Sequence, residues 1–577
     1  MSAKHVSRRD FLGIVGLGAA TLAAKGMRVD QVFPGLDDVP LSVHPLNKPF
    51  LKPSAQQTSA VPDVEINMRA TPTFAPILPG TPTQVLSYQS TLVKGKPSNL
   101  IALPDNYLGP IIRVHQGQRL RVNFTNALPE DTTVHFHGPC IPSNMGGHPH
   151  GVDVVHPGGT FIYEFDILDR ASPFWFHPHP DMRTAFQVYY GLAGLCLISD
   201  DVEAQAGLDT GEYDIPLVIQ DRTFDSNNQF VYLSGGMGMM GMMQGFLGNR
   251  ILVNGKPDYV QSVAPGTYRL RLYNGSNARN YRLAWQDGTP LMVLGTDGGL
   301  LPKPVQRNYV MLAPAERIDL WVDFTGKREG TELVMQSLPF PAGMGGMMGG
   351  GMMGGGMMGG GMGGGMMGGG MGGRMGGSMM GGGMGGMMAG NTMMPQGAAF
   401  NVFKVRIEGA KKQPLTLPKT LVGTPQYQLR DAVNINSPRT INLGMQRMVW
   451  TLNGRVFEME AIADDEYIPF DTLEVWDFVN YTMIAHPMHI HNIQFNIIER
   501  QSSMSGSSDY QTIRSGFVDE GWKDTVLVLP GERVRLLVKF LTYSGMYMYH
   551  CHILEHEVMG MMRNLMVGEG THSMDMP

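Results

Sequence analysis

The sequence has little cysteine, little net charge and no long apolar run. Three cysteines in 577 residues are too few for the disulfide framework of small secreted domains, so we expect an essential cysteine to be a ligand or a nucleophile. The formal net charge is 44 − 50 = −6, which argues against a nucleic-acid-binding protein. No stretch is long and apolar enough for a transmembrane helix, so we expect no stable membrane span.

Sustained helical periodicity is missing too, and short runs of alternating polar and apolar residues take its place. Examples are residues 119–124, 268–273 and 533–538, and a similar phrase ending in Gly-Gln, Gly-Thr or Gly-Glu precedes each. This alternation predicts half-buried strands, and the recurrence predicts three related β-sandwiches. We place them at residues 64–205, 206–408 and 425–570, in an all-β chain.

The N-terminus has the pattern of an export signal. Residues 7–12 read SRRDFL, and a weakly apolar run follows up to residue 24. Twin arginines before a short apolar run resemble a twin-arginine signal, which we assign to residues 1–30. We therefore expect an exported or periplasmic protein. A cytosolic chain with a chance Arg-Arg pair is the alternative.

Glycine and methionine are concentrated between residues 343 and 394, which hold 19 of the 46 methionines and a single charged residue, Arg374. Glycine is costly to order and no periodic apolar face exists, so we expect this insert to be disordered. A smaller methionine group comprises Met237, Met239, Met240, Met242 and Met243. Thioether sulfurs bind Cu(I), so both segments are candidate sites for additional Cu(I). The alternative is a flexible insertion whose methionines do nothing specific or only scavenge oxidant.

Histidines occur in an unusual pattern. With 17 histidines in the chain, chance gives about 0.5 His-x-His pairs, whereas the sequence has five. Residues i and i+2 of a strand point to the same face, so one pair can offer two imidazoles to one metal centre. Four of the pairs, two early and two late, predict eight ligands in a shared site: His135, His137, His177, His179, His489, His491, His550 and His552.

The last pair encloses Cys551, which would face the opposite way and bind a second metal. One cysteine, two histidines and a weak axial methionine describe a blue copper site for electron transfer. His486, Cys551, His556 and Met561 supply that set. The thiolate residue would then be bonded through the backbone to two histidines of the first site.

Together these motifs resemble those of the multicopper oxidases: HFHG at 135–138, WFHPH at 175–179, HPMHIH at 486–491 and HCH at 550–552, followed by His556 and Met561. The resemblance covers nearly the whole chain. It implies three cupredoxin-like Greek-key sandwiches and four copper ions. Type 1 copper would be bound by His486, Cys551, His556 and Met561, and type 2 by His135 and His489. The type 3 pair would be bound by His137, His177, His179, His491, His550 and His552.

The resemblance also implies reduction of O₂ to water, which needs protons. Glu557 follows a ligand histidine, at a position where the family places an acid near the cluster. We therefore expect Cys551, His550 and His552 to carry electrons and Glu557 to donate protons. Glycine stands where the family has a second acid after the first motif. Asp153 is a candidate substitute, and His148 and His150 are expected in a loop.

The methionine-rich insert resembles that of bacterial copper-efflux oxidases. This makes Cu(I) the first candidate reductant and small aromatic reductants, as for laccases, the second. The residues before His486 lack the acid expected of a substrate-copper site in those oxidases, and Met483 is a possible replacement. A copper-sequestering protein of the periplasm is the alternative from another class. A cell-division relative without copper is disfavoured because all twelve ligand positions are filled. We expect a monomer, and pairing of Cys140 with Cys196 stays open.

Overall fold

The computed structural model describes residues 61–568, except 104–105, 150–152, 209–210, 234–237, 342–393 and 422–425. The predicted signal at residues 1–30 lies outside the described residues, as does the predicted insert apart from Met394. Met237 and the side chains of Met239 and Met240 lie outside them as well. In the part of the chain that is described, no helix could span a membrane by its length and hydropathy.

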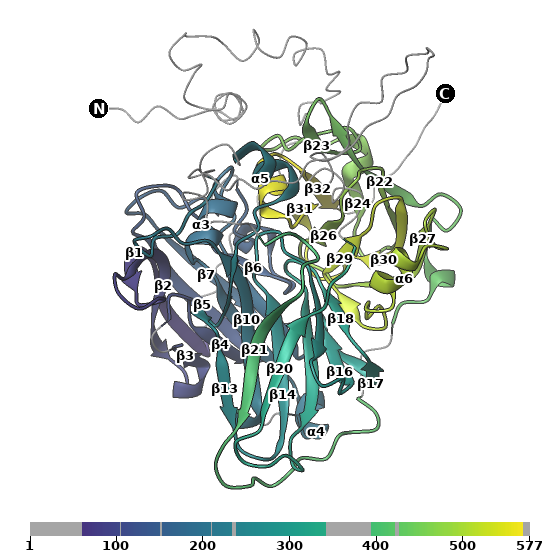
Figure 1. Ribbon diagram of the computed structural model, residues 1–577. Helices are drawn as coiled ribbons and strands as arrows, with labels where there is room; N and C mark the ends of the chain where they lie inside the picture. The colour runs from purple at the N-terminus through teal and green to yellow at the C-terminus, as the bar shows by residue number, and fades with distance from the viewer. Residues whose placement is uncertain are drawn as a thin grey trace, which may run out of the picture.

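The described strands form six sheets, which pair along the chain into three β-sandwiches (Figure 1). The first sandwich has one sheet of order β2 (Thr83–Lys94), β1 (Val64–Ala75), β5 (Arg119–Asn126) and β7 (Thr160–Asp166), and one of order β3 (Leu100–Ile101), β4 (Ile111–His115), β9 (Gly194–Ser199), β8 (Ser172–His177) and β6 (His135–His137).

The middle sandwich has the larger sheets. The first is of order β12 (Lys256–Pro257), β11 (Arg250–Val253), β10 (Asp214–Arg222), β14 (Thr267–Asn274), β19 (Arg317–Asp323), β16 (Leu291–Thr296) and β17 (Gly299–Arg307), and the second of order β13 (Val260–Val263), β21 (Phe400–Ile407), β20 (Glu332–Ser337), β15 (Tyr281–Trp285) and β18 (Val310–Leu312).

The third sandwich completes the set. Its sheets are of order β23 (Val449–Leu452), β22 (Arg439–Gln446), β25 (Leu473–Asn480), β30 (Glu532–Lys539), β27 (Phe495–Ser502) and β28 (Trp522–Lys523), and of order β24 (Tyr467–Pro469), β32 (Met562–Gly568), β31 (Gly545–Cys551), β26 (His486–Ile490) and β29 (Thr525–Val528). The prediction of an all-β chain with three sandwiches is confirmed. The boundaries at 205/206 and 408/425 stay predictions.

The three sandwiches share one topology, as the recurring phrase predicted. In each, the first strand pairs parallel with a later one: β1 with β5, β10 with β14, and β22 with β25. The second sheets agree as well, in the orders β4-β9-β8-β6, β13-β21-β20-β15 and β24-β32-β31-β26. Strands β8, β20 and β31 are therefore equivalent, and so are β6, β15 and β26.

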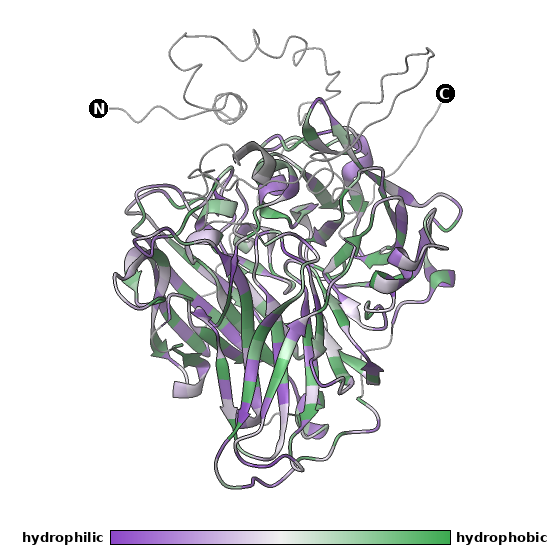
Figure 2. Ribbon diagram, in the orientation of Figure 1, coloured by the Kyte–Doolittle hydropathy of each residue, from purple (hydrophilic) through white to green (hydrophobic). Residues whose placement is uncertain are grey.

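The strands predicted at 119–124, 268–273 and 533–538 are found as β5, β14 and β30. Many strands are striped hydrophilic and hydrophobic, as Figure 2 shows. Strand β5 alternates between buried and partly buried residues, but the prediction that β14 is half-buried is wrong because all eight of its residues are buried. Its Arg269 and Arg271 stay charged inside the protein because Glu203, Asp214 and Asp319 pair with them.

Helices in the described residues are short: α3 (Thr184–Tyr190), α4 (Asp201–Gln205), α5 (Gly238–Gln244), α6 (Ser508–Arg514) and α7 (Leu554–Val558). Helix α7 lies at the end of β31 and packs against α3 and α5. The thiols of Cys140, Cys196 and Cys551 are free, so Cys140 and Cys196 do not pair. Burial raises the pKa of Cys196 to about 12, which keeps this thiol protonated and inert.

Candidate metal centre

The four predicted histidine pairs come from equivalent places in the first and third sandwiches. In the first, β6 pairs with β8 so that His135 lies opposite His177. In the third, β26 pairs with β31 so that His489 lies opposite His550. The equivalent strands of the middle sandwich, β15 and β20, contain no histidine. The middle sandwich keeps the fold but contributes no imidazole from these strands.

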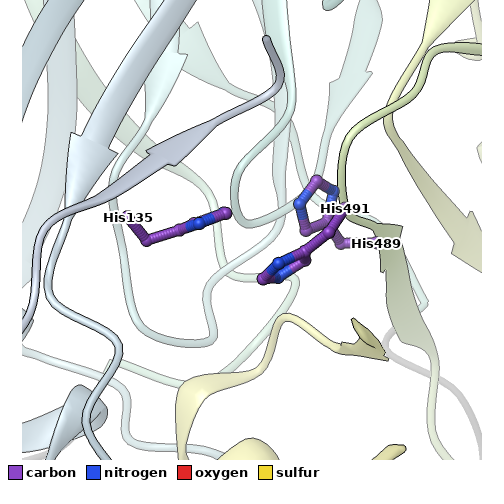
Figure 3. Close-up of side chains that lie close together, drawn as sticks. All are labelled: His135, His489 and His491. Atoms are coloured by element: carbon purple, nitrogen blue, oxygen red, sulfur yellow. The ribbon is translucent and has the colours of Figure 1, made fainter. Parts of the chain in front are cut away.

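The rings of the two sandwiches meet face to face. His135 stacks on His491 with a ring-centroid distance of 4.1 Å, and His137 stacks on His489 at 3.7 Å. Figure 3 shows His135 reaching from β6 toward His489 on β26 and toward His491, which directly follows that strand. All eight histidines of the four pairs are at most 3% exposed. They form one buried group, the histidine cluster.

Within the histidine cluster, ring nitrogens converge in small sets. Nε2 of His550 lies 3.1 Å from Nε2 of His491 and 3.4 Å from Nε2 of His179. A second set joins Nδ1 of His137 to Nε2 of His177 at 3.5 Å. His552 lies beside that second set, with ring-centroid distances of 5.0 Å to His137 and 5.3 Å to His177. Nitrogens of His135, His489 and His491 also lie within 4.8 Å of one another.

For two of the rings, backbone carbonyls fix which nitrogen faces the cluster. Nδ1 of His135 donates to the Gly146 carbonyl oxygen at 2.7 Å, and Nδ1 of His489 donates to that of Asp524 at 2.7 Å. Nε2 of each ring is then a bare lone pair, and both atoms are buried without a hydrogen-bond partner among the described residues. A buried nitrogen in this state costs free energy unless a metal ion accepts its lone pair.

Burial also keeps the rings neutral. It lowers the pKa of His135 to about 4 and that of His550 to about 3, and it holds the pKa of the other cluster histidines well below the ordinary value. Metal ligation requires the neutral imidazole. The histidine cluster is thus in the protonation state that a metal needs.

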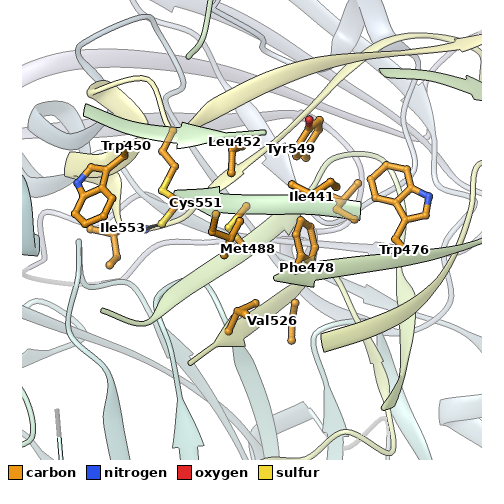
Figure 4. Close-up of a cluster of buried hydrophobic side chains, with 14 of the residues drawn as sticks. Ile441, Trp450, Leu452, Trp476, Phe478, Met488, Val526, Tyr549, Cys551 and Ile553 are labelled. Carbon is orange, nitrogen blue, oxygen red and sulfur yellow. Dashed lines mark hydrogen bonds between the residues drawn. The ribbon is translucent and has the colours of Figure 1, made fainter. Parts of the chain in front are cut away.

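Cys551 belongs to a second buried set in the core of the third sandwich (Figure 4). Its Sγ lies 3.4 Å from Nδ1 of His486 and 3.6 Å from Nδ1 of His556, and the two nitrogens are 3.3 Å apart. The backbone N–H of Ile553 donates to the same sulfur at 3.4 Å. Met561 is fully buried, and its carbonyl accepts from the N–H of Cys551 at 3.0 Å. A thiol flanked by two imidazoles is a donor set that suits copper.

The outer nitrogens of this set are also held. Nε2 of His486 hydrogen-bonds to Oγ1 of Thr482 at 2.8 Å, and Nε2 of His556 donates to the carbonyl of Met243 at 3.2 Å. Trp450 packs on both rings, with centroid distances of 4.6 Å to His556 and 5.1 Å to His486. Both Nδ1 atoms are therefore directed at the sulfur.

Family models described as multicopper oxidase match residues 85–203 and 432–571. The laccase of Bacillus subtilis (strain 168) is 30% identical over 516 residues, which cover 81% of this chain and 90% of that protein. The chain belongs to the multicopper oxidase family.

Two further proteins are similar over most of the chain. The crystal structure of the McoA multicopper oxidase from the hyperthermophile Aquifex aeolicus has a TM-score of 0.68 and 31% identity, and covers 88% of this chain and 97% of that chain. A cell division protein, FtsP of Xenorhabdus nematophila, is 28% identical over 472 residues, which cover 80% of this chain and 84% of that protein. The three sandwiches are thus cupredoxin-like, and the protein is a laccase-like oxidase of a family that uses copper.

Glu557 lies in α7 against the histidine cluster. Its two carboxylate oxygens are 3.6 Å from Nδ1 of His179 and 3.5 Å from Nδ1 of His550. Burial raises the pKa of Glu557 to about 8. A carboxyl with such a pKa holds a proton at neutral pH, and this one holds it beside two cluster imidazoles.

Asp153 does not contact the histidine cluster directly but is separated from it by one residue, His148. Its carboxylate accepts from the backbone N–H of His148 at 3.1 Å, and the His148 ring stacks on His491 with a centroid distance of 5.4 Å. Burial raises the pKa of Asp153 to about 7. His148 is in a loop, as expected, yet it is buried against the cluster; His150 lies outside the described residues.

Sequence reasoning missed Asp524 and Trp450. Asp524 is fully buried, accepts from Nε2 of His137 at 3.1 Å and holds His489 through its carbonyl. The only signal in the sequence is the charged pair Lys523-Asp524 beside an apolar strand, which does not reveal its histidine partners. Trp450 lies 36 residues before His486 in the sequence, and nothing in the sequence alone indicates that hairpin β22–β23 folds over the cysteine site.

The lowered pKa values predict the pH dependence of the metal-free protein. Above pH 6.5 these histidines are neutral in both the folded and the unfolded chain. As the pH falls, the unfolded chain binds protons that the folded chain rejects, so stability falls until about pH 4 for His135. Each histidine contributes up to about 1.4 kcal/mol per pH unit to the slope.

The measurement is chemical denaturation of the metal-free chain between pH 7 and pH 4, beside the variant His135→Gln. The variant should show a shallower slope. Equal slopes for the parent chain and His135→Gln would contradict the neutral buried cluster.

Proposed function

We propose that this protein couples the one-electron oxidation of Cu(I), or of a small organic reductant, to the four-electron reduction of O₂ to water. One observation carries the proposal. The sulfur of Cys551 lies between His486 and His556, while the residues on either side of it, His550 and His552, lie in the histidine cluster. A short covalent path therefore joins the two buried groups.

We assign four copper ions. Type 1 copper is bound by His486, Cys551, His556 and Met561, and type 2 copper by the bare Nε2 atoms of His135 and His489. The type 3 pair is bound by His179, His491 and His550 on one ion and by His137, His177 and His552 on the other. Bound copper at these positions supplies reversible one-electron chemistry and binding of O₂.

The chain's own residues keep the imidazoles of this site neutral, exclude water from it and supply it with protons. Neutral imidazoles present their lone pairs without a charge to displace. Water is excluded because the cluster lies in the seam between two sandwiches. Glu557 holds a proton beside His179 and His550, and Asp153 acts as the second acid through the His148 ring, whose Nδ1 is 3.6 Å from its carboxylate.

Cu(I) is the reductant that we favour. His556 is fully buried, and its outer nitrogen donates to the carbonyl of Met243 near the end of α5. A bulky phenol therefore has no direct contact with this ring, whereas a small ion delivered by methionines needs none. Met483 is half exposed and lies three residues before His486, so it is a candidate residue to bind Cu(I) on its way to that site. The likeness to the Bacillus laccase keeps small aromatic reductants as the second choice.

The cellular role that follows is copper tolerance. Export to the periplasm by the twin-arginine pathway, on residues 8 and 9, suits an enzyme that removes Cu(I) outside the cytoplasm. A copper-sequestering protein is the alternative from another class. It would bind Cu(I) without steady O₂ uptake.

The test is O₂ consumption by the copper-loaded protein with Cu(I) and with a phenol. The intact chain is compared with a chain lacking residues 343–393 and with one in which every methionine of that segment is serine. Met394 is kept because its carbonyl accepts from Arg279 at 2.7 Å. Both variants should lose Cu(I) turnover, and phenol turnover should hold or rise in the shortened chain.

Unchanged Cu(I) turnover in both variants would make the laccase function the first choice. Loss in the shortened chain alone would assign the effect to length rather than to thioethers. No O₂ uptake with either reductant, despite bound Cu(I), would favour sequestration.

A second test concerns Glu557. Glu557→Gln removes the proton but keeps the size of the side chain, so we expect turnover to fall about 10²–10³-fold. The rate at which the blue colour disappears on reduction of type 1 copper should be unchanged, because that step needs no proton from Glu557.

Glu555→Gln is the matched control, on the same helix and equally buried. Glu555 accepts from Tyr232 and Asn277 instead of approaching the cluster. Stopped-flow absorbance and O₂ uptake measure the two steps separately. Equal turnover in Glu557→Gln and Glu555→Gln would contradict the assignment of Glu557 as the proton donor.

A further inference from the structure

The middle sandwich places a buried arginine at the seam where the histidine cluster lies. Arg317 is the first residue of β19 and is 1% exposed. Its guanidinium lies against residues of all three sandwiches. We propose that Arg317 is a positioning residue that holds the copper ligands His137 and His489 in place, so that the middle sandwich is required for copper binding although it offers no ligand.

Every N–H of the guanidinium has a partner. Nη1 and Nη2 donate to the two carboxylate oxygens of Asp524 at 2.7 and 2.6 Å. Nε donates to the carbonyl of Pro173 in β8 at 2.8 Å. The remaining donors reach the carbonyls of Ala315 and Asp297 at 3.0 and 3.1 Å. Five donors in a planar fork are thus used in full, a geometry that lysine cannot reproduce.

Asp524 transmits this placement to two rings of the cluster. Its Oδ1, already held by Arg317, accepts from Nε2 of His137 at 3.1 Å, which directs Nδ1 of that ring toward His177. Its carbonyl accepts from Nδ1 of His489 at 2.7 Å, which leaves Nε2 free for a metal. The two rings stack at 3.7 Å, so one carboxylate residue orients both.

Arg317 also holds a strand of the first sandwich. The Pro173 carbonyl that it binds lies in β8, four residues before His177. One arginine therefore links the strand that bears His177 to the loop that supports His137 and His489. Partners of this kind set ring orientation, and their loss lowers metal affinity about 10–100-fold.

The inference rests on the proposed copper sites, and its test reads the two kinds of site separately. Arg317→Met and Arg317→Lys are compared with Arg279→Met, each as the full copper-loaded chain. Arg279 is equally buried in the middle sandwich and pairs with Asp221 at 2.8 Å, but it binds no residue of the cluster seam. The readouts are copper per chain, the type 2 signal in electron paramagnetic resonance and the blue absorbance of type 1 copper.

We expect Arg317→Met to keep the blue absorbance and to lose the type 2 signal, with affinity for cluster copper lower by about 10–100-fold and recovered at excess copper. Arg317→Lys should show the same selective loss in smaller measure. Arg279→Met should keep both signals in the fraction of the protein that folds. If Arg317→Met yields no blue protein, the inference is tested with Arg317→Lys instead.

Two results would overturn the inference. One is a type 2 signal of full intensity and unchanged affinity in the Arg317 variants. The other is an equal loss in Arg279→Met, which would show that any lost buried charge has this effect. If the parent chain itself binds no type 2 copper, the proposed function fails rather than the role of Arg317.

Discussion

The structure depends on one constraint: ten imidazoles are kept neutral and out of water at two neighbouring sites. All ten are at most 3% exposed, and burial lowers the pKa of each. Burial of so many polar rings is unfavourable unless each nitrogen has a partner. In seven of the ten rings a carbonyl, a carboxylate or a hydroxyl hydrogen-bonds to the outer nitrogen, and the inner lone pair is left for a metal ion. The chemistry of the protein follows from that division.

Repetition of one sandwich makes the arrangement possible. Strands β8 and β31 are equivalent in topology, as are β6 and β26, so the same edge of two sandwiches presents histidines to a common seam. The alternation of β31 then places Cys551 on the other face, inside the third sandwich. The middle sandwich has no histidine on β15 or β20, and in our account it acts through Arg317 instead.

Much of the site could be predicted from the sequence because it lies in local patterns. The His-x-His spacing fixes two rings on one face of a strand, and the position of Cys551 between His550 and His552 fixes its opposite direction. Asp524 and Trp450 could not be predicted, because they reach the site through contacts between distant segments. The same holds for β14, whose buried arginines alternate like surface residues but pair with acids elsewhere in the fold. Residue pattern reports the face of a strand, not what covers it.

The most direct test of the central claim is the stoichiometry of O₂ reduction. The copper-loaded protein is supplied with a limiting amount of O₂, and oxidised reductant and hydrogen peroxide are measured together. If the two proposed copper sites store electrons together and Glu557 supplies protons, four reductant equivalents are consumed per O₂ and no peroxide is released. Two equivalents per O₂ with release of peroxide would contradict the account, because the cysteine site and the histidine cluster would then not act as one.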